Sequence, residues 1–145
     1  MNKLALLIMI VVLGTGCATA PSPVQDERST DPKMILDKTW QWISTTTPVE
    51  KIEASNPERY TILLSTEGRL QAKFDCNGGG GGYEISDGKL AFSPLISTRM
   101  ACPEGTQDHL FMKDLQRVQS FFLHDGELYL ELPMDSGTMR FREAK

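Results

Sequence analysis

Apolar and polar residues alternate along several stretches of the chain, which is the pattern of strands with one buried face. The segment Thr39–Thr46 places Trp40 and Trp42 on the same face. Arg59–Thr66 and Arg69–Asp75 follow, and the second of these alternates cleanly between apolar and polar side chains. We therefore expect three strands here, with the two tryptophans in the core rather than on a ligand platform.

The pattern continues to the end of the chain, with short turns between the strands. Further strands are expected at Tyr83–Ser86, Lys89–Phe92, Val118–His124, Glu127–Leu132 and Thr138–Arg142. Tight turns in which glycine supplies positive φ are expected at Glu67–Gly68, Asp87–Gly88 and Asp125–Gly126. These turns predict an antiparallel meander. Residues 50–58 are polar and are expected to form a long connection, and residues 94–98 a short extended piece.

One segment has a helical period. A helix is expected to begin near residues 103–106, because Pro103 suits a first helical turn. Its apolar face comprises Leu110, Phe111, Leu115 and Val118. Its polar side is expected to include Asp108, Lys113 and Asp114. The whole pattern predicts an α+β fold that is mainly antiparallel β, with about seven or eight strands in a curved sheet or partial barrel and one helix packed against it.

The first 16 residues have the three parts of an export signal. Lys3 gives a positive start, Leu4–Leu13 is an unbroken apolar run, and Gly14–Gly16 supplies small residues. The run has ten residues, too few to cross a bilayer, which takes about 20. Small residues leading into Cys17 resemble the lipobox of bacterial lipoproteins, although Gly14 stands where that pattern usually has leucine.

The lipobox resemblance implies that Cys17 becomes a lipidated first residue; an ordinary cleaved, secreted protein is the alternative. Ala18 rather than aspartate follows the cysteine, which by analogy with Gram-negative sorting favours the outer membrane. Residues 17–37 then form the lipidated cysteine and a flexible tether, because residues 18–33 are rich in proline and polar side chains. Residues 38–145 are long enough for one domain.

The charge of the chain bears on its partners. The formal net charge is -4 for the whole sequence, and no run of basic residues is present. Because phosphate contacts need clustered lysine or arginine, we expect no nucleic-acid binding.

A run of five glycines, Gly78–Gly82, suggests at first a phosphate-binding loop. Such a loop leads into a helix, whereas this run leads into the strand-like Tyr83–Ser86. We expect instead a flexible crossing between strands, where absent side chains allow close backbone approach.

The residues around this run resemble the META domain family, which includes HslJ-like heat-shock lipoproteins. The resemblance rests on Cys76–Asn77, on Gly81, on Asp87–Gly88 with Leu90, and on Thr98–Arg99–Met100 followed by Cys102. It extends over residues 38–143 and implies structural roles for Asn77, Gly81, Gly88, Thr98, Arg99 and Met100. For Arg99 we expect hydrogen bonds to carbonyl groups at a strand end, with a ligand or partner contact as the alternative. Gly79 stands where the family commonly has an aromatic residue, so we expect a looser loop here.

The sequence contains three cysteines. If Cys17 is lipidated, Cys76 and Cys102 remain, and an exported protein is expected to join them in a disulfide. Free thiols, a metal site and a nucleophilic cysteine are the alternatives. They are weaker because only His109 and His124 are available as further ligands or bases, and neither has ligand spacing from a cysteine.

No grouping of residues in the sequence points to catalysis, and Asp75, Glu104 and His109 are the only loosely grouped candidates. We therefore expect a non-enzymatic protein without cofactor or metal, anchored in the outer membrane with its domain in the periplasm. The family resemblance implies a role in envelope stress and in tolerance of novobiocin-type antibiotics, with an unknown envelope protein or small ligand as partner. The alternative is a carrier of small ligands or lipids with a cavity lined by Trp40, Trp42, Phe74, Phe92 and Leu128.

Overall fold

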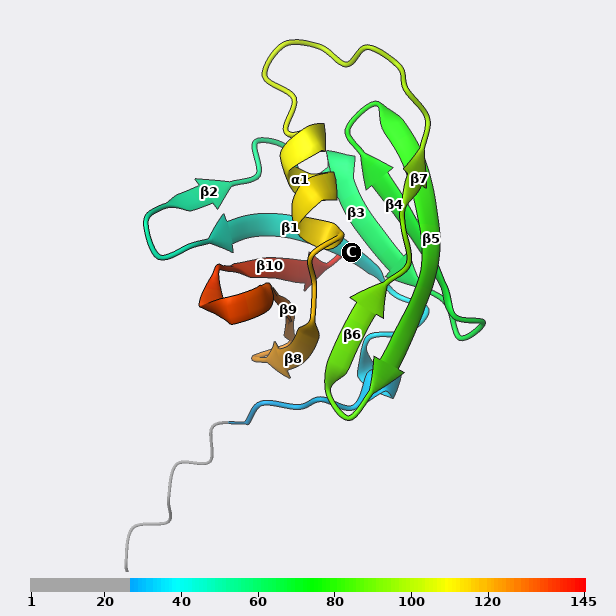
Figure 1. The fold of residues 1–145 in the computed structure, drawn as a ribbon, viewed down its shortest axis with the longest axis vertical. Helices are drawn as coiled ribbons and strands as arrows, with labels where there is room; N and C mark the ends of the chain where they lie inside the picture. Colours follow the sequence, from blue (N-terminus) through cyan, green and yellow to red (C-terminus); the bar gives the residue numbers. More distant parts are fainter. Residues whose placement is uncertain (1–26) are drawn as a thin grey trace, which may run out of the picture.

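The computed structural model describes residues 27–145 and shows a curved antiparallel sheet that closes into a barrel (Figure 1). The eight barrel strands are β1 (Thr39–Thr46), β3 (Tyr60–Leu64), β4 (Arg69–Phe74), β5 (Asn77–Ser86), β6 (Lys89–Phe92), β8 (Ser120–His124), β9 (Glu127–Glu131) and β10 (Thr138–Glu143). Two short strands, β2 (Lys51–Glu53) and β7 (Ile96–Ser97), pair outside this ring with β1 and β5. The expected fold class is confirmed.

Neighbouring barrel strands follow one another along the chain, and β10 pairs with β1 to close the ring. The expected turns are confirmed at Asp87–Gly88 and Asp125–Gly126, where both residues have positive φ. This conformation matches the right-handed twist of a two-residue hairpin, which is why aspartate and glycine stand there. The shortest strand pairing in the barrel is between β6 and β8, where only Lys89 and Ser120 are in register.

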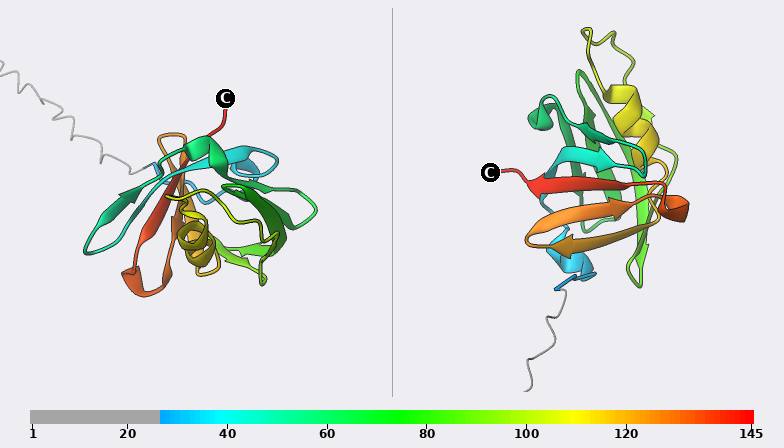
Figure 2. Two further views of the ribbon diagram at one scale, coloured as in Figure 1. Left: turned by 90° about the horizontal axis from the view of Figure 1, so that it is seen from above. Right: turned by 90° about the vertical axis from the view of Figure 1, so that its left-hand side faces the viewer.

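The barrel interior is filled by aromatic and aliphatic side chains. Helix α1 (Asp108–Leu115) lies between the two sides of the curved sheet, as Figure 2 shows in its left view. Phe111 of α1 is fully buried, and its ring centre lies 5.2 Å from that of Trp42, 5.7 Å from Tyr60 and 5.9 Å from Phe74. The two tryptophans of β1 therefore belong to the core, as expected.

The helix differs from its sequence-based prediction in three ways. It ends at Leu115, so Val118, expected on its apolar face, lies beyond it. It begins at Asp108 rather than near residues 103–106. The preceding Gln107 is held by β-sheet residues instead: its backbone N–H donates to the Tyr60 hydroxyl at 2.8 Å, and its side chain donates to the Glu53 carbonyl at 2.9 Å. Asp114, expected on the polar side, is buried. Its carboxylate accepts a hydrogen bond from the Thr45 hydroxyl, and that hydroxyl accepts one from the Trp42 indole at 3.1 Å.

Other segments also differ from expectation. The polar connection of residues 50–58 contains β2 and a short 3-10 helix, η2 (Pro57–Arg59). The glycine run is no flexible crossing, because Gly78–Gly82 lie within β5 and pair with β4. The looser loop expected at Gly79 is likewise wrong, since Gly79 pairs with both Ala72 and Ser97.

The last part of the expected tether packs on the barrel. Ser29 pairs with Leu123 of β8, and a 3-10 helix, η1 (Pro32–Met34), follows. Ile35 is fully buried, and its carbonyl accepts a hydrogen bond from the Trp40 indole at 3.0 Å. Burial of Ile35 gives this segment the apolar contact that its polar composition does not suggest. The contacts with the barrel thus begin before residue 38.

No helix among residues 27–145 is long and apolar enough to cross a membrane. The expected export signal and the first part of the tether, including Cys17, lie outside the described residues.

Candidate functional site

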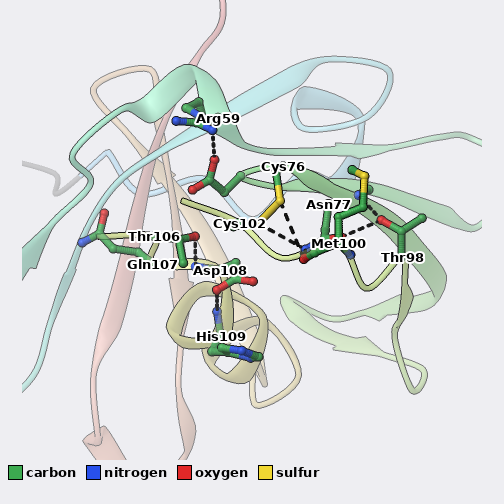
Figure 3. The surroundings of a disulfide bond; sticks show 12 residues. Arg59, Cys76, Asn77, Thr98, Met100, Cys102, Thr106, Gln107, Asp108 and His109 are labelled. Carbon is green, nitrogen blue, oxygen red and sulfur yellow. Dashed lines mark hydrogen bonds and ion pairs between the residues drawn. A yellow bond between two sulfur atoms is a disulfide. The ribbon is translucent and has the colours of Figure 1, made fainter. Parts of the chain in front are cut away.

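The disulfide expected between Cys76 and Cys102 is present, with 5.5 Å between the two Cα atoms (Figure 3). Cys76 lies between β4 and β5, just after Asp75, whose backbone has a φ of 60°. Cys102 lies in the connection between β7 and α1. The bond therefore ties this connection to the sheet close to the first residue of β5.

Asn77 organises the connection next to the disulfide. Its Oδ1 accepts hydrogen bonds from the Met100 N–H at 2.7 Å and from the Thr98 hydroxyl at 2.9 Å. Its Nδ2 donates to the Met100 carbonyl at 3.1 Å and contacts Cys102 Sγ at 3.3 Å. The side chain is buried, and the two bonds to Met100 replace those that a neighbouring strand would supply. Figure 3 shows these residues converging on the disulfide.

The glycines of the family motif provide space rather than ligands. A Cβ at Gly81 would lie 3.2 Å from the Leu95 side chain and 3.3 Å from the Pro94 carbonyl, where the chain passes from β6 to β7. Gly88 has a φ of 76° in the hairpin turn between β5 and β6. Both positions therefore favour glycine for a steric or conformational reason.

Arg99 behaves differently from the other motif residues. It is exposed, and within residues 27–145 its side chain makes no hydrogen bond or ion pair. The carbonyl-binding role expected for Arg99 is thus not seen. The backbone of its neighbour Met100 is hydrogen-bonded to Asn77, while 60% of the Met100 surface is exposed to solvent.

A groove of about 700 Å³ lies between this connection and the start of α1. Its lining includes Ile96, Arg99, Met100, Asp108, His109 and Met112. Phe74, Asn77 and Thr98 also contribute to it, so three of the predicted motif residues, Asn77, Thr98 and Met100, meet Arg99 here. Sequence reasoning named these four residues but did not predict a groove, because the groove depends on how the connection crosses in front of α1.

The residues considered for catalysis are not joined into one site. Asp75 is buried, forms an ion pair with Arg59, and lies 3.3 Å from the Tyr60 hydroxyl, which donates to it. Glu104 and His109 are exposed, and within the described residues no hydrogen bond links either of them to Asp75.

The described residues hold no cluster of three or more histidine, cysteine, aspartate or glutamate side chains suited to a metal ion. The side chains expected to line a carrier cavity belong to the packed core instead: Trp40, Trp42, Phe74 and Leu128 are buried, and Phe92 packs against them. Of these side chains, Phe74 also lines the groove beside α1.

The comparisons with known proteins agree with this fold. The family model described as META domain matches residues 33–145. No curated protein matches the chain. A protein from Burkholderia xenovorans solved by NMR is 23% identical, with a TM-score of 0.66, and the match covers 94% of this chain and 99% of that one.

A DUF4847 family protein from Bacteroides vulgatus, solved by crystallography, is 12% identical with a TM-score of 0.58, over 78% of this chain and 96% of that one. At these identities the two structures support the fold alone. The family-model match spans most of the sequence and includes every predicted motif residue from Asn77 to Met100. This chain belongs to the META domain family.

Proposed function

We propose that the chain is a non-enzymatic, lipid-anchored protein of the bacterial cell envelope. In this proposal Cys17 carries the lipid, the barrel lies in the periplasm, and the outer membrane holds the anchor. The protein supports tolerance of envelope stress and of novobiocin-type antibiotics by acting as a binding or support module.

The observation that carries the proposal is the disulfide between Cys76 and Cys102. Structural disulfides persist in oxidising compartments such as the periplasm and are rare in the cytosol. Because the sequence has three cysteines, this bond leaves Cys17 at the end of an apolar leader, where the lipobox pattern stands. Lipid chains on that residue would hold a soluble barrel at a bilayer.

The contacts of the candidate acid and base groups support a non-enzymatic role. General acid–base or nucleophilic catalysis needs groups within hydrogen-bond reach of a common reacting atom. Asp75 is paired with Arg59 and Tyr60, while His109 lines the groove and has no hydrogen bond to Asp75 within the described residues.

The anchor is tested by fractionating cells that express the wild type, Cys17→Ser or Ala18→Asp, followed by mass spectrometry of the N-terminal peptide. We expect the wild type in the outer membrane with acyl chains on Cys17. Cys17→Ser should move to the soluble periplasmic fraction, and Ala18→Asp should move to the inner membrane. A wild-type protein that is soluble, with an unmodified Cys17, would contradict the anchor.

The stress role is tested by comparing a deletion strain with its parent on heating and on exposure to novobiocin. We expect reduced survival of the deletion strain and recovery when the wild-type gene is returned. Equal survival of the two strains in both conditions would count against this role while leaving the anchor open.

A further inference from the structure

The groove beside α1 has the size of a site for one small molecule. Its volume of about 700 Å³ falls in the range of roughly 300–1,000 Å³ that is usual for ligand pockets. One wall is the connection from Leu95 to Ala101, and the other is the start of α1, with Asp108, His109 and Met112.

Apolar side chains stand in this groove without being covered. Ile96 is 77% exposed and Met100 is 60% exposed, although both lie beside a packed core that includes Leu95 and Phe74. Among residues 27–145, β7, which carries Ile96, pairs with β5 alone, and no strand covers its other edge. Met112 adds a third flexible apolar surface from α1, and methionine adapts well to ligands of different shape.

Arg99 brings a positively charged side chain to this groove. Arg99 makes no hydrogen bond or ion pair with the described residues, while its guanidinium offers several donors. Asp108 also lines the groove, but its carboxylate accepts the His109 N–H at 2.7 Å at the positive end of α1. An apolar body with one anionic group would therefore complement the apolar surface of the groove and the charge of Arg99.

The groove wall is held in place before any ligand arrives. The disulfide fixes Cys102, and the two hydrogen bonds from Asn77 fix the backbone of Met100. A preformed wall lowers the ordering cost of binding.

The position of the groove bears on where the ligand comes from. β5 starts beside the disulfide at Asn77 and ends near the turn at Gly88, against which Thr30 lies. Its ten residues span about 30 Å. Figure 1 shows the first described residues (blue) and the connection before α1 at opposite ends of the barrel. If Cys17 is anchored, as the proposed function holds, the chain reaches the barrel from the membrane at the end opposite the groove, which leaves the groove open to free molecules.

We propose that this groove binds a free amphiphilic organic anion, with Arg99 contacting the anionic group and Ile96, Met100 and Met112 contacting the apolar body. The choice of a free ligand over bilayer lipid rests on the proposed anchor, whereas the binding itself does not.

The test uses two fluorescent probes with related ring systems: 8-anilinonaphthalene-1-sulfonate, which carries one negative charge, and uncharged N-phenyl-1-naphthylamine. Both are titrated into the full chain carrying Cys17→Ser. We expect the anion to bind about tenfold more tightly than the neutral probe, the size expected for one charge-assisted hydrogen bond. Arg99→Ala should remove this difference, and Arg99→Lys should keep most of it.

Lys113→Ala is the matched control, because Lys113 is an exposed cation of α1 that does not line the groove. It should leave both affinities unchanged, and Met100→Ser should weaken both probes. Melting temperatures equal to that of the Cys17→Ser parent would show that each variant is folded. The proposed site would be overturned if neither probe binds, or if Arg99→Ala does not weaken binding of the anionic probe.

A second arm sediments the same chain with vesicles of phosphatidylethanolamine and phosphatidylglycerol. We expect no binding to the vesicles. Sedimentation that depends on Arg99 would overturn the choice of a free ligand. A negative result in the probe titration or in the vesicle experiment does not change the outcome of the Cys17 fractionation. The proposed anchor and the proposed binding site can therefore be rejected separately.

Discussion

The side-chain amide of Asn77 pairs with both backbone polar groups of Met100, accepting its N–H at 2.7 Å and donating to its carbonyl at 3.1 Å. This arrangement supplies to the connection before α1 what a neighbouring strand would otherwise supply. It explains why an asparagine next to Cys76 is matched to the Thr98–Met100 segment more than 20 residues later. The motif is a means of fixing that segment against β5.

Replacing Asn77 by alanine should destabilise the domain by about 2–4 kcal/mol, because a buried, fully hydrogen-bonded side chain is lost and the Met100 N–H and carbonyl lose their partners. Urea unfolding in the Cys17→Ser background measures this loss. Asn77→Asp keeps an acceptor for the Met100 N–H and the Thr98 hydroxyl but places a carboxylate oxygen against the Met100 carbonyl, so it should also be destabilising. Ser86→Ala, at the exposed far end of β5, is the control and should stay within about 0.5 kcal/mol of its parent. An Asn77→Ala variant as stable as that control would show that the pairing contributes nothing.

Removing the disulfide with Cys76→Ser and Cys102→Ser should lower the free energy of unfolding by roughly 3–4 kcal/mol. The bond closes a loop across a sequence separation of 26 residues, and an open loop leaves the unfolded chain more freedom. The same decrease should appear when the parent is unfolded in the presence of a reductant, and the reductant should not affect the double variant further. A decrease below about 1 kcal/mol would mean that the other contacts of the connection suffice to hold it.

Alanine at Gly79 should be far more damaging than alanine at Gly78. A Cβ at Gly79 would lie 2.0 Å from the Ile96 carbonyl oxygen, so β5 and β7 would have to separate, at a cost of about 3 kcal/mol or more. At Gly78 the nearest atom is 4.0 Å away, and the substitution should change stability by less than about 1 kcal/mol. Thermal unfolding of the two variants compares them directly. Equal melting temperatures would contradict the close approach of the strands.

Burial raises the pKa of the Asp114 carboxyl above its ordinary value, and the charges of Lys113 and Arg117 oppose this only in part. The folded protein therefore binds the Asp114 proton more tightly than the unfolded chain does. This stabilising difference is fully present below the unfolded pKa and is lost as the pH rises through the folded pKa.

Asp114→Asn removes that dependence while keeping an acceptor for the Thr45 hydroxyl. We expect the stability of Asp114→Asn relative to the parent to increase as the pH rises from 4 to 7, measured by urea unfolding at each pH. A relative stability that is constant over this range, or that falls, would contradict the raised pKa.

The strands and hairpins could be predicted because they depend on local patterns. Alternation gave β1, β3, β4 and β9, and the Asp-Gly pairs marked two turns whose geometry needs those residues. The glycine strand could not be predicted in this way, because glycine has neither a side-chain period nor a strand preference. Glycine is needed at Gly79 and Gly80 because the backbones of β7 and β4 leave no room there for a Cβ.

The residues of the site could be predicted from the sequence, but their arrangement around a groove could not. The cysteine count and the motif pointed to Cys76, Cys102, Asn77 and Met100, which the structure brings together. The late start of α1 depends on the bond between Gln107 and Tyr60, residues 47 positions apart, and no local signal marks it. The exposure of Ile96, and the lack of a partner for the Arg99 side chain within the described residues, likewise have no local signal in the sequence.

The central claim is that the domain acts through the groove beside α1 as a binding module. It is tested most directly by returning Arg99→Ala or Lys113→Ala to the deletion strain at wild-type protein levels and counting survivors under heat and novobiocin. We predict that Lys113→Ala restores survival fully and that Arg99→Ala, although equally stable and anchored, does not. Full recovery with Arg99→Ala would contradict the claim.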